Sequence, residues 1–126
     1  MRYLLDSTLL IDHANGDAPA SALLRRLFEE GHDLLSCDVV TCEVLSLGTD
    51  AEVRHLRTLL NALDYVATAP DAAAWAGASR RQRHLSGHKR SLADALIAGV
   101  AQAMDATVVT RNRPDFERQG IPVVTY

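Results

Sequence analysis

Four acidic residues lie within or just beyond the most apolar segments of this chain. Asp6 ends RYLLD, Glu43 lies in DVVTCEVLSL, Asp94 lies in LADALIAGVA, and Asp115 follows soon after TVVT. An ionised carboxylate that is carried toward a core loses its hydration, which costs several kcal/mol unless the charge is paired or bound to a cation. No Lys or Arg is adjacent in sequence to Asp6, Glu43 or Asp94. A bound divalent cation is therefore the leading explanation.

Glu43 is the acid that local structure explains least well. In a helix over residues 38–47 it shares one face with Val39, Val40 and Leu47, so its side chain is expected to point inward. It lies in the middle of that helix, where neither helix capping nor the helix dipole accounts for a carboxylate.

The other three acids each have a structural alternative. Ser91-Leu92-Ala93-Asp94 fits the capping pattern in which the acid bonds back to the first residue of the pattern. Asp115 follows Pro114 and is also explained as a first-turn acid of a helix over 114–119. Asp6 is in position to cap a helix that begins near Ser7. Taken singly, these residues leave capping and metal binding open.

Apolar periodicity predicts strands that alternate with helices. Short strand-like runs cover residues 1–5, 33–36, 65–67, 107–110 and 123–125, and helical spacing covers residues 20–30, 38–47, 51–63, 71–84 and 91–104. This alternation predicts an α/β fold with a mostly parallel sheet covered on both faces, and the length predicts one domain over residues 1–126.

The predicted sheet would bring the acids together. Ligands of parallel α/β sheets bind at the carboxyl ends of the strands, near a switch in strand order. Asp6 lies at such an end, and Asn112 and Asp115 follow the strand at 107–110. Carboxylates that converge in one crevice repel each other unless a cation neutralises them, and hard ions such as Mg²⁺ or Mn²⁺ prefer oxygen ligands.

The amount and distribution of charge limit how this protein could bind nucleic acid. The net charge of −3 argues against a protein that coats nucleic acid through bulk electrostatics. No acid lies between Asp71 and Asp94, and this interval contains a local positive patch that we interpret either as an RNA-backbone contact or as a solvated helix end. The patch consists of Arg80, Arg81, Arg83, Lys89 and Arg90.

Cysteine usage and hydropathy bear on location. Cys37 and Cys42 lack zinc-site spacing and are expected to be reduced and buried. The chain has no long apolar span and no leader-like N-terminus, so we expect a soluble, cytoplasmic protein without membrane contact.

The chain resembles the PIN-domain ribonucleases, in particular the toxins of VapBC-type toxin–antitoxin pairs. The resemblance rests on LLDSTLLID, CEVLSL, SLADALIAGVA and VVTRNRPDF, in this order along the whole chain. It implies a three-layer α/β/α sandwich with a short parallel sheet, an endoribonuclease dependent on Mg²⁺ or Mn²⁺, a cognate antitoxin, and a homodimer.

The resemblance also implies roles for individual residues. By position, Asp6 and Asp94 correspond to the principal metal ligands and Glu43 to a third acid. The fourth place of the site is open between Asn112 and Asp115, and we include Asp115 among the catalytic acids. Many relatives have an Asp or an Asn at the position of Asn112, with a further acid at or near the position of Asp115. We interpret Asn112, with Ser7 and Thr110, as support for the site.

The same residues can be compared with the requirements of three other functions. A non-catalytic RNA- or protein-binding module of the same fold is favoured by Asn112, because a neutral residue weakens a second metal position. A haloacid-dehalogenase-like phosphatase needs a second Asp two residues after Asp6, where Thr8 stands. A metal-independent nuclease built on His84 and His88 leaves the apolar-segment acids unexplained. Trp75 and Tyr65 are candidates for base stacking, but a core role is the stronger expectation for both.

Overall fold

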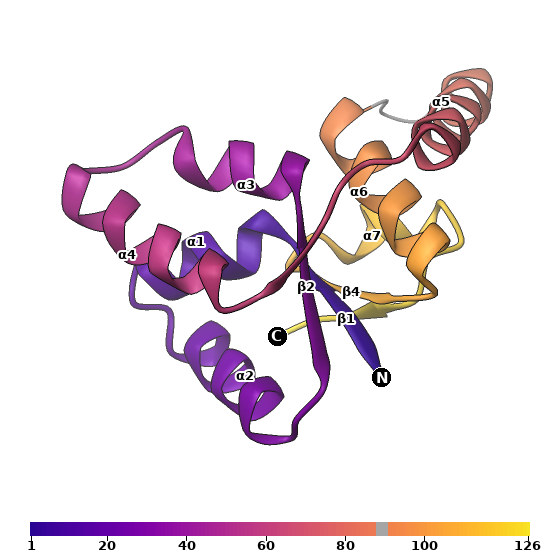
Figure 1. Ribbon diagram of the computed structural model, residues 1–126. Helices are drawn as coiled ribbons and strands as arrows, with labels where there is room; N and C mark the ends of the chain where they lie inside the picture. Colours follow the sequence, from indigo (N-terminus) through magenta and orange to yellow (C-terminus); the bar gives the residue numbers. More distant parts are fainter. Residues whose placement is uncertain (88–90) are drawn as a thin grey trace.

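The fold is a five-stranded parallel sheet with helices on both faces, seen in a computed structural model that describes residues 1–87 and 91–126 (Figure 1). The strands of this described part are β1 (Arg2–Leu5), β2 (Asp33–Cys37), β3 (Asp64–Val66), β4 (Thr107–Val109) and β5 (Val123–Val124). The helices are α1 (Ser7–Ala14), α2 (Ala18–Glu29), α3 (Asp38–Leu45), α4 (Asp50–Asn61), α5 (Pro70–Leu85), α6 (Leu92–Met104) and α7 (Arg113–Glu117).

The sheet order is β3-β2-β1-β4-β5, and every pairing is parallel. The chain first builds outward from β1 to β3 and later adds β4 and β5 on the other side of β1, so the strand order reverses between β1 and β4. In Figure 1, α1 to α4 lie on one side of the sheet and α5 to α7 on the other. The predicted three-layer α/β/α sandwich with a parallel sheet is confirmed.

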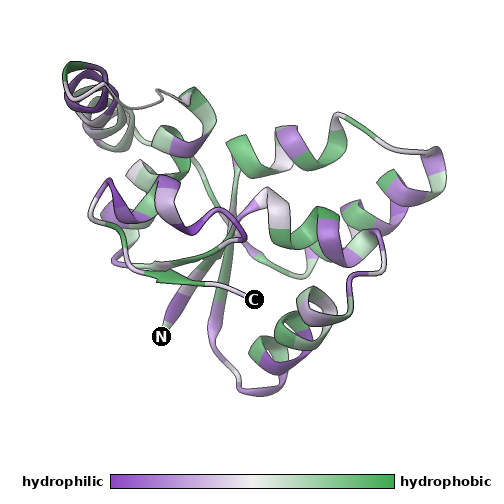
Figure 2. Cartoon of the chain, turned by 180° about the vertical axis from the view of Figure 1, so that it is seen from behind, coloured by the Kyte–Doolittle hydropathy of each residue, from purple (hydrophilic) through white to green (hydrophobic). Residues whose placement is uncertain are grey.

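The core is centred on the two strands that meet at this reversal. Leu4 and Leu5 of β1 and Val108 and Val109 of β4 are fully buried, because both faces of the sheet are covered by helices. Figure 2 shows hydrophobic and hydrophilic stretches alternating along the helices, as expected for helices that bury one face. Within the described residues, no helix has the length and apolar content needed to cross a membrane.

The predicted elements are present, but one boundary changes an interpretation. The helix that contains Glu43 ends at Leu45, so Leu47 does not share a helix face with it and is 79% exposed. Gly48 has a φ of 107°, a conformation that a helix cannot continue through, and Thr49 then caps α4 by accepting a hydrogen bond from the N–H of Glu52. The final helix likewise covers Arg113–Glu117 and not residues 114–119.

Candidate active site

The candidate site lies at the carboxyl ends of β1 and β4, where the strand order reverses. Asp6 directly follows β1 and its N–H donates to the carbonyl oxygen of Val109 over 3.0 Å, which extends the pairing of the two strands by one step. Asp6 occupies the N-cap position of α1, yet its carboxylate makes no capping hydrogen bond. The acid is only 2% exposed, and the backbone N–H groups of Ser7 and Thr8 at the start of α1 still favour its charged form.

Two threonine hydroxyls hold the Asp6 carboxylate. Thr8 Oγ1 donates to Asp6 Oδ2 over 2.9 Å, and Thr110 Oγ1 donates to the same oxygen over 2.7 Å. Each hydroxyl also accepts a backbone N–H, from Arg111 at 3.1 Å and from Asn112 at 2.9 Å, respectively. These amides fill an acceptor position on each hydroxyl and leave its hydrogen directed to Asp6. Neither hydroxyl contacts Oδ1 of Asp6.

Burial and the hydrogen-bond donors have opposite effects on the pKa of Asp6. Burial raises the pKa of Asp6 above its ordinary value, because desolvation penalises the charged carboxylate. The hydroxyls of Thr110 and Thr8, followed by the backbone N–H groups of Ser7 and Thr8, act in the opposite direction and lower that pKa. The raised pKa shows that the surrounding hydrogen bonds offset only part of the desolvation cost.

Glu43 approaches Asp6 from α3. Ser7 Oγ donates to Glu43 Oε1 over 3.0 Å, which links the first residue of α1 to the middle of α3. Burial raises the pKa of Glu43, and the negative charge of Asp6 raises it further, while the Ser7 hydrogen bond lowers it. The inward direction predicted for Glu43 is thus what the structure has, although the predicted contact face was wrong at Leu47.

Asp94 and Asp115 are brought together from α6 and α7. Burial, then the negative charges of Asp6 and Asp115, raise the pKa of Asp94 to about 6. A side-chain hydrogen bond with Asp115 raises that pKa as well, so the two carboxyl groups lie close together. Ser91 caps α6 by accepting the N–H of Asp94 over 3.3 Å, which is the half of the predicted capping pattern that involves the serine hydroxyl. A hydrogen bond of the Asp94 carboxyl group with the Ser91 side chain lowers the pKa of Asp94.

The remaining predicted supporting residues take different parts. Ser7 and Thr110 contact site carboxylates directly, whereas Asn112 contributes its backbone N–H to Thr110 and its side chain makes no capping hydrogen bond for α7. Arg111 is close in sequence, but its Nη1 pairs with both oxygens of Asp12, at 2.8 and 3.0 Å. The positive charge of Arg111 therefore neutralises Asp12 and not the acids of the candidate site.

The donor set can be tested for its fit to a divalent cation. The pKa values of Asp6, Glu43 and Asp94 are raised by burial, and those of Glu43 and Asp94 also by neighbouring carboxylates, a combination that a bound cation would relieve. In the described part of the chain, no three His, Cys, Asp or Glu side chains form a ready-made metal-binding group. Mg²⁺ keeps several waters and is usually held by one or two carboxylates. The residues therefore fit a partly hydrated hard ion and not a closed protein cage.

Sequence reasoning missed Thr8, which was considered only as a residue unlike the second Asp of a phosphatase. Its signal was the DST segment, in which a hydroxyl two residues after an acid can return to the carboxylate at a helix start. Tyr65 is 62% exposed, so the core role expected for it was wrong, whereas Trp75 packs against the core.

The predicted positive patch does not form one exposed surface. Arg81 is exposed and Arg80 is half-buried, but Arg83 is only 4% exposed, because it lies on the same face of α5 as the buried residues Ala72 and Ala76. As a component of an exposed patch, Arg83 was wrongly placed. Lys89 and Arg90, and with them His88, lie outside the described residues.

Comparison with known proteins identifies relatives along almost the whole chain. The PIN domain family model matches residues 3–121. Ribonuclease VapC19 of Mycobacterium tuberculosis is 28% identical over 113 residues, which cover 90% of this chain and 90% of the relative. Among solved structures, VapBC2 from Rickettsia felis bound to a DNA fragment from its promoter has a TM-score of 0.86 at 21% identity, covering 100% of this chain and 99% of that one. A toxin–antitoxin complex from Klebsiella pneumoniae has a TM-score of 0.77 at 26% identity, with 98% and 96% coverage.

Proposed function

Because this chain belongs to the PIN-domain family, we propose that it is a cytoplasmic endoribonuclease, dependent on Mg²⁺ or Mn²⁺, that acts as the toxin of a toxin–antitoxin pair. The observation that carries the proposal is the convergence of four acids at the strand-order reversal: Asp6, Glu43, Asp94 and Asp115. Burial and neighbouring carboxylates raise the pKa of Glu43 and of Asp94 there. The name Ribonuclease VapC19 of the relative from Mycobacterium tuberculosis supports the choice of RNA as substrate.

Asp6 and Asp94 are the residues that we assign to the metal. Asp6 is held in place by Thr8 and Thr110, whose hydroxyls both bind its Oδ2. Asp94 contributes a carboxyl group whose negative charge is disfavoured by Asp6 and Asp115 until a cation is present. When bound, the divalent cation supplies a lowered pKa for an attacking water and charge compensation on the phosphate oxygens.

The remaining acids are assigned to the water and to the geometry of attack. Glu43, fixed by Ser7, accepts a hydrogen bond from the attacking water and orients it, and Asp115, beside Asp94, orients a second water or a second ion. The water oxygen forms a new bond to phosphorus as the bond from phosphorus to the 3′-oxygen breaks. A proton returns to that oxygen, and the products carry a 5′-phosphate and a 3′-hydroxyl.

The partners follow from the same family relationship. The solved neighbours from Rickettsia felis and Klebsiella pneumoniae are a VapBC protein and a toxin–antitoxin complex, and we propose a cognate antitoxin for this chain on that basis. We also propose a homodimer. Size-exclusion chromatography with light scattering tests the dimer, and co-expression with the gene immediately upstream tests the antitoxin.

A non-catalytic RNA- or protein-binding module is the second candidate, favoured by the neutral Asn112 and by the absence of a ready-made three-ligand metal group among the described residues. The two candidates differ in one assay. A labelled single-stranded RNA is incubated with purified protein in EDTA, in Mg²⁺ and in Mn²⁺, and the 5′ ends of the products are identified.

The enzyme is expected to cleave only with metal, and Asp6→Asn is expected to lose at least about 100-fold in rate. The matched control is Asp64→Asn, which removes an exposed carboxylate on β3 and should cleave like the wild type. Equal cleavage in EDTA and in Mg²⁺ would refute the metal-dependent mechanism, and folded wild-type protein without any cleavage would favour the binding module.

A further inference from the structure

Arg83 of α5 is a buried arginine that has no counter-ion among the residues that the structure describes. Arg83 is 4% exposed, and its Nε and Nη1 atoms have no hydrogen-bond partner in the described part of the chain. Its side chain also forms no ion pair with any residue of that part. A guanidinium stays charged at all relevant pH values, and an uncompensated buried charge is strongly destabilising. Among the described residues, no group neutralises this charge, so a bound anion would stabilise the position.

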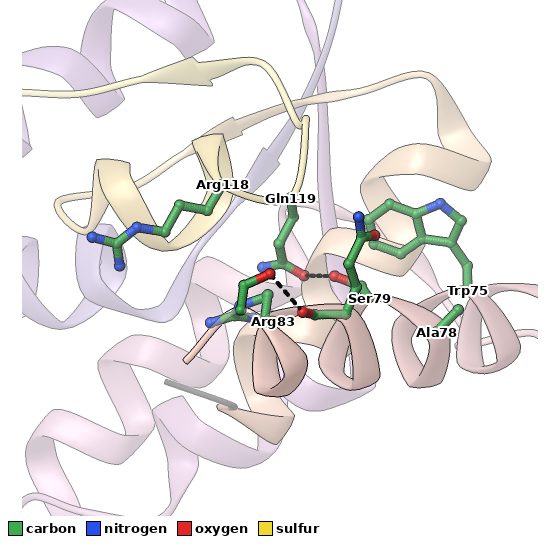
Figure 3. Close-up of a pocket in the computed structure, with 8 residues that line it drawn as sticks. Trp75, Ala78, Ser79, Arg83, Arg118 and Gln119 are labelled. Atoms are coloured by element: carbon green, nitrogen blue, oxygen red, sulfur yellow. Dashed lines mark hydrogen bonds between the residues drawn. The ribbon is translucent and has the colours of Figure 1, made fainter. Parts of the chain in front are cut away.

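A cavity of about 310 Å³ lies beside this arginine, between α5 and the end of α7 (Figure 3). Trp75, Ser79 and Arg83 line it from α5, and Arg118 and Gln119 line it from the C-terminal end of α7. The lining contains two arginines and no acidic residue. Arg118 is exposed and makes no ion pair within residues 1–87 and 91–126, so its charge is also open to a ligand.

The packing of α5 against α6 determines the direction of the Arg83 side chain. Arg83 follows Ala72 and Ala76 on the buried face of α5. The small residues of this face let α5 approach α6 so closely that a Cβ on Gly99 would lie 2.4 Å from the carbonyl oxygen of Ala72. Arg83 therefore points inward because it lies on the same face of α5 as the alanines that pack against α6.

The same wall is connected to the candidate active site. Ser79 Oγ donates to Gln119 Oε1 over 2.8 Å, and these two side chains point toward one another in Figure 3. Gln119 Nε2 donates in turn to the backbone carbonyl of Asp115 over 2.7 Å. Two hydrogen bonds thus connect Ser79, in the cavity wall, through Gln119 to the backbone of Asp115, an acid of the candidate site.

We propose that this cavity is a subsite for a phosphate group of the RNA, one that lies outside the bond to be cleaved. The proposal rests on the proposed ribonuclease function and adds a location for substrate binding. Guanidinium groups and hydroxyls are the donors that proteins use for phosphate oxygens, and such contacts fix the register of a nucleic acid without reading its sequence. Trp75, on the wall, offers an aromatic surface for an adjacent base.

Phosphate is favoured over a protein carboxylate by the link between the cavity and the candidate site, because the cavity residue Gln119 binds the backbone carbonyl of Asp115. An RNA strand whose scissile phosphate lies at the carboxylates must continue past that helix. The carboxylates repel the strand unless a cation is bound, whereas Arg83 and Arg118 attract it without a metal. The cavity would then hold the RNA while the carboxylate site positions the bond.

Binding to a labelled single-stranded RNA, measured in the Asp6→Asn background so that no cleavage occurs, tests the proposal. Arg83→Met is expected to weaken binding several-fold and to reduce the slope of log K against log salt by about 0.7, the value for one phosphate contact on a single strand. Arg118→Met should act in the same direction and provides a second variant if Arg83→Met does not fold. The matched control, Arg25→Met, removes an exposed arginine of α2 and should leave the slope unchanged.

Thermal unfolding with inorganic phosphate supplies an independent readout. At equal ionic strength, sodium phosphate should stabilise the wild type more than sodium chloride does, and Arg83→Met should abolish that difference while unfolding at a higher temperature than the wild type in chloride. Unchanged RNA affinity and salt slope in both arginine variants would overturn the proposal, even if free phosphate stabilised the protein. Weaker dimerisation or antitoxin binding at unchanged RNA affinity would overturn it too, in favour of a protein carboxylate. Failure of the ribonuclease function itself would appear separately, as absence of metal-dependent cleavage by the wild type.

Discussion

The hydroxyl of Thr110 donates a 2.7 Å hydrogen bond to Oδ2 of Asp6, a residue 104 positions earlier in the chain. The contact exists because β1 and β4 are parallel neighbours and both end at this level of the sheet. Thr110 is fully buried and its hydroxyl also accepts the N–H of Asn112, so both residues are fixed by the backbone around them. The geometry of the principal proposed metal ligand therefore depends on a residue that would not itself touch the metal.

Replacing Thr110 by Val should reduce activity without removing any carboxylate. The variant keeps the shape of the side chain but leaves Asp6 with one hydroxyl donor, and loss of such a supporting contact typically lowers metal affinity or activity about 10- to 100-fold. The measurement is kcat/KM for RNA cleavage across a Mg²⁺ titration. Thr110→Ser restores the hydroxyl and should recover most of the rate, and a Val variant as active as the wild type would contradict this role.

Asp94 should make the metal-free protein less stable as the pH rises. The pKa of Asp94 is about 6 in the folded protein, against an ordinary value of 3.8, so between about pH 4 and pH 6 the folded state binds more protons than the unfolded state. The free energy of unfolding therefore falls as pH rises through that window. In EDTA, Asp94→Asn should unfold several degrees higher than the wild type at pH 7, given that 1 kcal/mol corresponds to about 4 °C at this size, and the difference should shrink toward pH 4.

Two observations would separate this effect from a general loss of charge. Asp64→Asn, the exposed control, should show no pH-dependent gain in unfolding temperature. Asp94→Asn should also lose cleavage activity, although it is the more stable protein in EDTA. A variant that unfolds at the wild-type temperature throughout this pH range would show that Asp94 titrates normally.

Ser7→Ala should shift the acid side of the pH–rate profile. The Ser7 hydroxyl lowers the pKa of Glu43 by donating to its charged form, so removing the hydroxyl should raise that pKa further. If Glu43 acts as the ionised group that orients water, the rate should begin to fall at a higher pH in the variant, with a loss of less than about tenfold near pH 8. Ser46→Ala, just beyond α3, is the matched control. An unshifted profile would remove Glu43 from the ionisations that govern the rate.

Gly99 and Gly77 form a natural pair for testing the packing of α5 on α6. A Cβ at Gly99 would lie 2.4 Å from the Ala72 carbonyl oxygen, whereas a Cβ at Gly77 would meet nothing within 4 Å. Gly99→Ala should therefore destabilise the protein by about 1–3 kcal/mol, because the helices must move apart. Gly77→Ala should be neutral or stabilise by up to about 1 kcal/mol, because alanine favours a helix interior. Chemical denaturation measures both, and equal stabilities would contradict this close approach.

The sequence by itself determined the succession of elements and the identity of the acids. Apolar runs at 107–110 and alternating helical faces depend on local periodicity, which needs no knowledge of the partner segment. The inward direction of Glu43 follows from its immediate helical neighbours Val39 and Val40. The end of α3 was harder to predict. The helix stops at Leu45, and the apolar spacing that includes Leu47 did not indicate this end or the positive φ at Gly48.

Only the tertiary structure decided which groups face one another. The hydroxyls of Thr8 and Thr110 meet on one oxygen of Asp6 because strand order and register align residues about a hundred positions apart. Arg83 belongs by composition to a charged run, but the packing of α5 on α6 turns it inward beside a cavity that α7 completes. The packing of the whole core sets the register of distant strands and the rotation of each helix about its axis. The sequence therefore identifies the candidate site residues, but their contacts with one another depend on the tertiary structure.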